Sequence, residues 1–196
     1  MQILLFDLGG VVVDYRGPER LAALSGGRLS LDDARAALSS DILHAFERGE
    51  VSELTFGEAM VRDCGLDLTP SAFIAEFETW PERFLPGAAA LIESLKGRYG
   101  LACLSNINEP HWRRCHALDL PRLFDAHFLS HEMGARKPEP EIYDAVIASL
   151  GAPAADFVFF DDVETNIAAA KAHGMSAFHV SPDRGLSGAI TDARIS

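Results

Sequence analysis

Three short apolar runs that each stop at polar side chains restrict the fold more than any other feature of the sequence. The runs and the residues that follow them are QILLF (2–6) before Asp7, LACL (101–104) before Ser105 and Asn106, and FVFF (157–160) before Asp161 and Asp162. Continuous apolar runs of this length, separated by helical patterns, are typical of parallel strands that are buried on both faces. Because ligands bind beyond the carboxyl ends of such strands, we expect the polar residues to line one site.

Two weaker runs, AHFLS (126–130) and SAFHV (176–180), extend the predicted sheet to about five strands. Boundary residues predict helices in the intervals, over 86–100, 137–151 and 161–174. Alternation of strands and helices indicates the α/β class, with helices on both faces of a parallel sheet. The sequence therefore predicts a three-layer Rossmann-like fold.

Residues 17–85 differ from the rest, because they show amphipathic helical patterns and no convincing strand. We interpret residues 15–85 as a helical cap, inserted into a catalytic core that is formed by residues 1–14 and 86–196. The last stretch, SPDRGLSGAITDARIS (181–196), is expected to be a loosely held tail.

Composition restricts the class of partner. The chain has 196 residues, 48% of them apolar, and a net charge of −12, so it lacks the clustered positive charge that nucleic acids or anionic membranes require. Cys64, Cys103 and Cys115 are odd in number and lack metal-ligand spacing, which predicts buried thiols in a reducing, cytoplasmic compartment. No signal peptide or membrane-spanning segment is predicted. The expected partner is a small molecule, and a monomer and a homodimer both stay open.

Carboxylates dominate the predicted site. We interpret Asp7 as a nucleophile or metal ligand rather than a simple strand terminator, because the glycines after it permit close approach to the backbone. Asp161 and Asp162 either begin the next helix or face Asp7, where acids repel one another unless a cation lies among them. Such an oxygen-rich site suits Mg²⁺, with Asp162 as the better ligand of the two.

Ser105 and Lys137 each have a simpler alternative. Taken alone, Ser105 is interpreted as the cap of a helix that begins near Glu109, and only its place beside the other clusters favours a role in the site. Lys137 precedes a helix N-terminus, where a positive charge is unfavourable. A solvated surface lysine is one interpretation, but a lysine that holds a phosphate explains the placement better, because the anion offsets the penalty.

Four segments occur in the order of the four motifs of the haloacid dehalogenase-like hydrolases and resemble them. They are FDLGGVVVD (6–14), LSNIN (104–108), ARKPEPEIY (135–143) and VFFDDVETNIAAAKAHG (158–174). The resemblance covers residues 3–180 and implies a C1-type cap. With FERGEVS (46–52) included, the chain is similar to the bacterial phosphatase branch that acts on glucose 1-phosphate and related small phosphoesters.

The resemblance implies a phosphatase mechanism. Asp7 attacks phosphorus in line and forms an aspartyl-phosphate, which water then hydrolyses. Ser105 and the backbone N–H of Asn106 bind phosphoryl oxygens, while Lys137 balances their charge.

The resemblance also implies Mg²⁺, held by Asp7, Asp162 and the Gly9 carbonyl, with Asp161 in support. Gly9 is a departure, because most phosphatases of the superfamily carry a second Asp there, which protonates the leaving oxygen. Its absence favours leaving groups that need little assistance, such as the hemiacetal oxygen of a sugar 1-phosphate. Asp14 is interpreted as a loop acid rather than as a substitute.

Two other function classes stay open. A 2-haloacid dehalogenase of the same superfamily also lacks the second Asp and needs no metal, but Asp161 and Asp162 would add uncompensated negative charge beside the departing halide. A non-catalytic binding protein on the same fold predicts decay of the site, whereas only Gly9 departs from the motifs.

The cap is expected to select the substrate, with Arg48 bonding sugar hydroxyls. Other candidates for the crevice and its entrance are His44, Phe46, Glu47, Trp80, His111 and Trp112. The alternatives are core positions for the aromatic residues and a solvated ion pair for Glu47 and Arg48.

Overall fold

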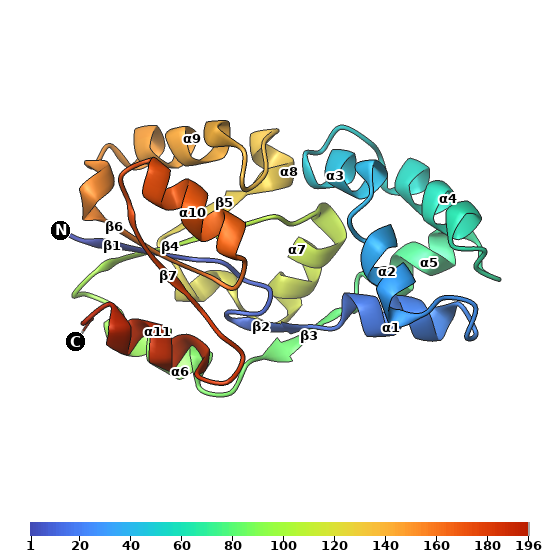
Figure 1. The fold of residues 1–196 in the computed structure, drawn as a ribbon, viewed down its shortest axis with the longest axis horizontal. Coiled ribbons are helices and arrows are strands. Elements are labelled where there is room, and N and C mark those ends of the chain that lie inside the picture. The colour runs from blue at the N-terminus through green and yellow to red at the C-terminus, as the bar shows by residue number, and fades with distance from the viewer. Residues whose placement is uncertain (196) are drawn as a thin grey trace.

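A five-stranded parallel sheet lies at the centre of the larger of two lobes in the computed structural model, which describes residues 1–195 (Figure 1). Its strands, in sheet order, are β5 (Ala126–Leu129), β4 (Gly100–Ser105), β1 (Ile3–Phe6), β6 (Phe157–Asp161) and β7 (Ser176–His179). The three strong apolar runs are the three central strands, and the two weaker runs are the edges. The predicted parallel α/β sheet is confirmed.

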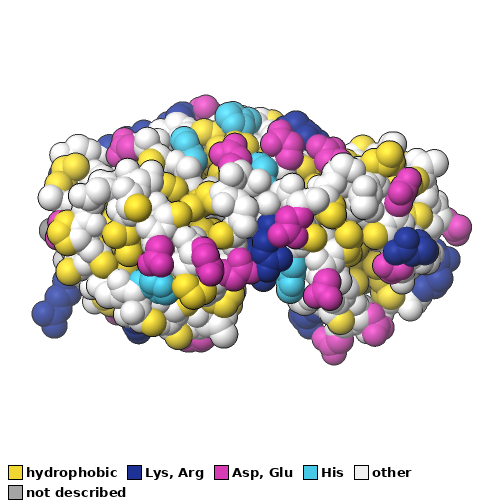
Figure 2. Space-filling model, turned by 90° about the horizontal axis from the view of Figure 1, so that it is seen from above, with side chains coloured by type: hydrophobic (Ala, Val, Ile, Leu, Met, Phe, Trp, Pro, Cys, Tyr) yellow, Lys and Arg dark blue, Asp and Glu magenta, His cyan; other side chains and the backbone are white. Residues whose placement is uncertain are grey.

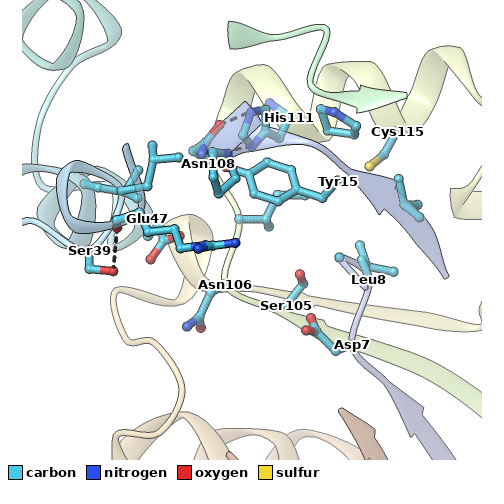
Figure 3. Close-up of a pocket in the computed structure, with 18 residues that line it drawn as sticks. Asp7, Leu8, Tyr15, Ser39, Glu47, Ser105, Asn106, Asn108, His111 and Cys115 are labelled. Carbon is cyan, nitrogen blue, oxygen red and sulfur yellow. Dashed lines mark hydrogen bonds between the residues drawn. The ribbon is translucent and has the colours of Figure 1, made fainter. Parts of the chain in front are cut away.

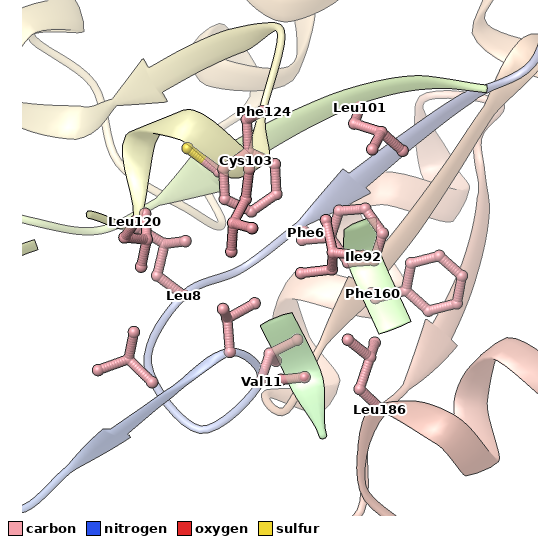
Figure 4. Close-up of a cluster of buried hydrophobic side chains, with 14 of the residues drawn as sticks. Phe6, Leu8, Val11, Ile92, Leu101, Cys103, Leu120, Phe124, Phe160 and Leu186 are labelled. Carbon is pink, nitrogen blue, oxygen red and sulfur yellow. The ribbon is translucent and has the colours of Figure 1, made fainter. Parts of the chain in front are cut away.

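Successive residues of each strand enter two different hydrophobic cores. Phe6 and Phe160 belong to one core (Figure 4), whereas Leu5 and Phe159 belong to the other. The helices of the first core are α6 (Ala88–Leu95), α7 (Glu109–Ala117) and α11 (Gly185–Asp192), and those of the second are α9 (Pro140–Leu150) and α10 (Glu164–Ala172). Because both faces are covered, the three central strands need apolar residues at successive positions, which explains their uninterrupted runs.

The smaller lobe consists of five helices that share a core of their own. They are α1 (Gly17–Leu24), α2 (Leu31–Ala37), α3 (Asp41–Glu47), α4 (Glu53–Asp63) and α5 (Pro70–Phe77). The side chains of Ser30, Ser52 and Thr69 cap α2, α4 and α5 by accepting from a backbone N–H of the first turn. In the core, Phe46 stacks on Phe56 with 4.3 Å between ring centroids.

Two short antiparallel strands, β2 (Val13–Tyr15) and β3 (Pro81–Phe84), join the lobes. The expectation that residues 17–85 contain no strand is therefore wrong at β3. The sequence PERF shows no alternation of its own, and its extended form depends on pairing with β2, far away in the chain. The cap boundaries at 15 and 85 remain a proposal.

The chain end and one helix also differ from expectation. Residues 181–195 are not a loose tail, because α11 buries Leu186, Ala189 and Ile190 in the core beside α6, whereas Ser196 lies outside the described residues. The helix predicted over 86–100 ends at Leu95. Three short elements complete the fold, namely the helix α8 (Ser130–Met133) and the 3₁₀ turns Pro121–Leu123 and Ala154–Asp156.

The prediction that the three cysteines are buried thiols is confirmed, because Cys64, Cys103 and Cys115 are all buried and free. Within residues 1–195, none of the helices has both the length and the apolar composition that are needed to cross a bilayer.

Candidate active site

Strand ends bring the predicted residues together at the carboxyl edge of the sheet. Asp7 directly follows β1, Ser105 ends β4 and Asp161 ends β6. Lys137, from the segment before α9, places its Nζ 2.9 Å from Asp7 Oδ1 and 2.6 Å from Asp161 Oδ2. One carboxylate oxygen each of Asp7, Asp161 and Asp162 lie within 4.8 Å of one another. The ends of β1 and β6 and the segment before α9 thus converge on one cluster of charges.

The lysine is buried and stays charged. Lys137 is 2% exposed, and burial alone would lower the pKa of its ammonium group, but the carboxylates of Asp7 and Asp161 outweigh burial and raise this pKa. The unfavourable placement of the Lys137 charge before a helix N-terminus is therefore offset by the carboxylates of Asp7 and Asp161.

Burial and the excess of carboxylates over lysine both shift the pKa values of the acids in this cluster. Burial raises the pKa of Asp7 to about 7, Lys137 opposes this rise, and the charges of Asp161 and Asp162 add to it. Burial also raises the pKa of Asp162. A divalent cation among the three carboxylates would remove this repulsion. Because all the donors are hard oxygens, the set fits Mg²⁺ and does not fit a metal that prefers sulfur or imidazole.

Asp161 and Asp162 differ in their burial and in their hydrogen bonds. Asp161 is fully buried, and its oxygens accept hydrogen bonds from Lys137, from the side chain of Asn166 at 3.0 and 3.1 Å and from the backbone N–H of Val163 at 2.7 Å. Asp162 is exposed at the edge of the sheet. This geometry supports Asp162 as the better metal ligand of the two and Asp161 as the residue that holds the Lys137 side chain in position.

Gly10 lies directly beside the same cluster, against the side chain of Asp162. Its φ of 72° lies in the left-handed region, and a Cβ at this position would overlap the Asp162 carboxylate. The chain therefore needs glycine at position 10 both for its conformation and for its contact with Asp162.

Ser105 is not the helix cap. The N-terminus of α7 is capped by Asn108, whose side-chain oxygen accepts from the backbone N–H of His111 at 3.1 Å. The Ser105 hydroxyl has no hydrogen-bond partner in residues 1–195 and faces the same cavity as Asp7 (Figure 3). The capping alternative for Ser105 is therefore wrong, and its hydroxyl is free to bind a ligand.

A cavity of about 440 Å³ opens above Asp7 and Ser105, between the two lobes (Figure 3). Tyr15 from β2 and Glu47 from α3 line it on the side of the helical lobe. Its size suits a small organic ligand.

A family comparison agrees with this site. Residues 1–174 match the family model of the haloacid dehalogenase-like hydrolases. The chain belongs to this family. The matched region contains all four motif segments and every residue of the charged cluster.

Relatives of this haloacid dehalogenase-like hydrolase include two named phosphatases. The sesquiterpene phosphatase astK of Aspergillus oryzae is 29% identical and is aligned over 90% of this chain and 88% of its own length. The D-ribitol-5-phosphate phosphatase of Bacteroides thetaiotaomicron is 28% identical, over 93% and 92%. The crystal structure of the HAD family enzyme bt-2542 from the same bacterium, in complex with magnesium and inorganic phosphate, superposes with a TM-score of 0.78 at 24% identity, covering 92% of this chain and 94% of that one.

The hydrolase places several predicted cap residues away from the cavity. Arg48 does not line it and instead pairs with Glu139. Glu47 does line it but is bound to Arg136 at 3.0 Å. Arg136 and Glu139 lie on either side of Lys137 in the chain, so these two pairs connect the end of α3 to the larger lobe. Figure 2 shows opposite charges meeting where the two lobes join. The expected contact of Arg48 with sugar hydroxyls is not supported by this arrangement.

The aromatic candidates for the crevice are core residues, with one exception. Phe46, Trp80 and Trp112 are buried in the hydrophobic cores, and His44 does not line the cavity. His111 does line it, but burial lowers its pKa to about 3, so the ring is neutral. Because the carbonyl oxygen of Phe77 can only accept, His111 Nε2 carries the proton and donates to it at 2.9 Å.

Asn106 has a role that sequence reasoning missed. Its side chain accepts from the backbone N–H of Lys137 at 2.7 Å and donates to the Lys137 carbonyl at 2.9 Å, so it ties the loop after β4 to the lysine segment. The expected contact of its backbone N–H with a phosphoryl oxygen stays a prediction. No sequence pattern indicates this bridge, because its two ends lie 31 residues apart.

Asn106→Ala should loosen Lys137 without removing it. Two backbone groups lose their partners, so we expect a loss of about 1–3 kcal/mol in the free energy of unfolding and about tenfold in kcat/KM. Urea denaturation and steady-state kinetics measure the two effects. Ser94→Ala removes an exposed hydrogen bond of α6 and serves as the control. Unchanged stability and activity in Asn106→Ala would show that Lys137 needs no such support.

Proposed function

We propose that this hydrolase is a Mg²⁺-dependent phosphatase that cleaves a small phosphomonoester through an aspartyl-phosphate on Asp7. One observation carries the proposal. The carboxylate of Asp7 and the unpartnered hydroxyl of Ser105 face one cavity, beside a lysine that is bound to two carboxylates. A nucleophile, a hydrogen-bond donor and a positive charge thus surround one point, as transfer of a phosphoryl group requires.

Each residue contributes a distinct step. Lys137 holds Asp7 by Oδ1, which orients the carboxylate toward the cavity. The carboxylate attacks phosphorus, the bond from phosphorus to the ester oxygen breaks, and this oxygen leaves as an alkoxide or phenolate that takes its proton from water. Water then attacks the acyl-phosphate, which releases inorganic phosphate and restores Asp7. Ser105 donates a hydrogen bond to a phosphoryl oxygen throughout.

Asp7, Asp162 and the Gly9 carbonyl would hold Mg²⁺, with Asp161 in support. When bound, the ion neutralises negative charge between the carboxylate and the phosphoryl group. The oxygen donor set of this chain and the magnesium complex of bt-2542 both support this part of the proposal.

The relatives restrict the alcohol part of the substrate less than they restrict its phosphoryl group. Of the two phosphatases, one is named for a sesquiterpene and the other for ribitol 5-phosphate, so the relatives include both apolar and polar alcohols. Glucose 1-phosphate remains a candidate, because its hemiacetal oxygen leaves without strong protonation and Gly9 supplies no acid.

Phosphate release from a panel of phosphomonoesters, with Mg²⁺ and with a chelator, tests the proposal. We expect release in Mg²⁺ and a loss of at least about 100-fold in kcat/KM when the ion is removed, because the charges of Asp7 and the phosphoryl group then repel each other. Halide release from 2-haloacids in chelator, without phosphate release from any ester, would support the dehalogenase alternative instead. No turnover of either kind would favour a binding protein.

A further inference from the structure

The cavity above Asp7 offers few free hydrogen-bonding groups to a leaving group. Most polar side chains of its lining already have partners, namely Asn106 with Lys137, Asn108 with His111, His111 with Phe77, Ser39 with the Arg35 carbonyl and Glu47 with Arg136. Arg35 also lines the cavity, its side chain is 57% exposed, and its Nη1 pairs with Asp32 at 2.8 Å. Apart from Ser105, which is needed for the phosphoryl group, the Tyr15 hydroxyl and the weakly donating Cys115 thiol are the lining groups without a hydrogen-bond partner in residues 1–195.

The rest of the lining is hydrocarbon. Its apolar residues come from both lobes and from the strands that join them, and they include Leu8, Val13, Pro18, Leu38, Leu43 and Pro81. Leu38 and Leu43 belong to the smaller, helical lobe, whose other lining side chains include Arg35, Ser39 and Glu47, and each of these three polar groups already has a partner within the protein.

A sugar would fit this cavity poorly for a simple reason. Each hydroxyl that is buried without a hydrogen-bond partner weakens binding by about 5- to 150-fold, and a hexose has several. A hydrocarbon group of the same size loses no hydrogen bonds with water and gains from its removal from water. The chemistry of the lining therefore selects against polyhydroxyl leaving groups.

We infer that the ester cleaved here is a phosphomonoester of an apolar alcohol or phenol. The inference rests on the proposed phosphatase function and names the substrate class of the same cavity. It ranks sugar phosphates, including glucose 1-phosphate, below apolar esters. Leu8, Leu38 and Leu43 become the specificity-determining residues, in place of Arg48.

A matched pair of substrates tests the inference in the unmodified protein. Cyclohexylmethyl phosphate and glucose 6-phosphate are both esters of a primary alcohol on a six-membered ring, and they differ mainly in the ring hydroxyls. With Mg²⁺ present, we expect kcat/KM to be about 100-fold higher for cyclohexylmethyl phosphate. Equal or higher kcat/KM for glucose 6-phosphate or glucose 1-phosphate would overturn the substrate class and leave the phosphatase function intact. Hydrolysis of none of the esters would overturn both.

A variant of the cavity wall gives a second test. Leu38 is half-buried at the end of α2, and Leu38→Asn adds a donor and an acceptor to the wall. We expect the ratio of kcat/KM between the two esters to fall at least about tenfold. Leu54→Asn makes the same change at a residue that is 56% exposed and does not line this cavity, so its ratio should stay at that of the wild type. An unchanged ratio in Leu38→Asn would count against the inference.

Discussion

Asp7→Asn is expected to lower kcat/KM for phosphate release by at least about 10⁴-fold while the protein stays folded. The amide is too weak a nucleophile to form the acyl-phosphate. Burial raises the pKa of Asp7 to about 7, whereas the pKa of an exposed aspartate is about 3.8, so above pH 7 the folded protein must keep a buried carboxylate ionised. The neutral amide removes this cost. In chelator at pH 8, the free energy of unfolding should therefore equal or exceed that of the wild type.

Kinetics and urea denaturation on one preparation separate the two effects. Asp14→Asn is the matched control, because Asp14 pairs with Arg16 at 3.1 Å and with Arg83 at 2.6 Å and does not line the cavity. It should change kcat/KM by less than about threefold. Wild-type activity in Asp7→Asn would contradict the nucleophilic role, and an equal loss in Asp14→Asn would show that Asp14 acts in catalysis.

Residues at strand ends were predictable because the parallel register determines their position. Phe6 lies opposite both Cys103 and Phe160, so the residues that follow these strands reach the same edge of the sheet. An apolar run shows where a buried strand ends, and parallel pairing places the ends of neighbouring strands at the same edge of the sheet. Asp7, Ser105 and Asp161 could therefore be brought together from the sequence alone.

Partners of long side chains could not be predicted in the same way. Arg48 and Glu139 are 91 residues apart and meet only because α3 docks beside the lysine segment. The expectation for Arg48 assumed that a cap cation faces the ligand, whereas a carboxylate of the catalytic lobe binds it. The helix α11 was missed for a related reason, since its few apolar residues form a stable face only against α6.

The two glycines after Asp7 show what the sequence leaves undecided. Both were expected to permit close approach of the backbone, but only Gly10 has a positive φ and a neighbour that excludes a side chain. A Cβ at Gly9 would lie 3.7 Å from the Cβ of Tyr15, which is an ordinary contact, and its φ is not in the left-handed region. Glycine at position 9 is therefore a chemical difference and not a requirement of the fold.

Gly9→Asp should consequently fold and gain activity on esters with poor leaving groups. Gly9 lines the cavity beside Asp7, so a carboxyl group there can protonate the leaving oxygen and then activate water. General acid–base assistance contributes about 10²–10⁴-fold, and we expect a gain in this range in kcat/KM for cyclohexylmethyl phosphate. For 4-nitrophenyl phosphate, whose leaving group departs without a proton, the gain should stay below about threefold.

Gly9→Asn separates proton transfer from the effect of a new side chain. It has nearly the same size and the same space beside Tyr15, but its amide cannot give or take the proton, so kcat/KM for both esters should stay at or below the wild-type value. A gain that is equal in the two variants, or equal for the two esters, would assign the effect to packing. A gain confined to Gly9→Asp and to the alkyl ester would show that wild-type turnover is limited by departure of the leaving group, which is what a chain without an acid at position 9 requires.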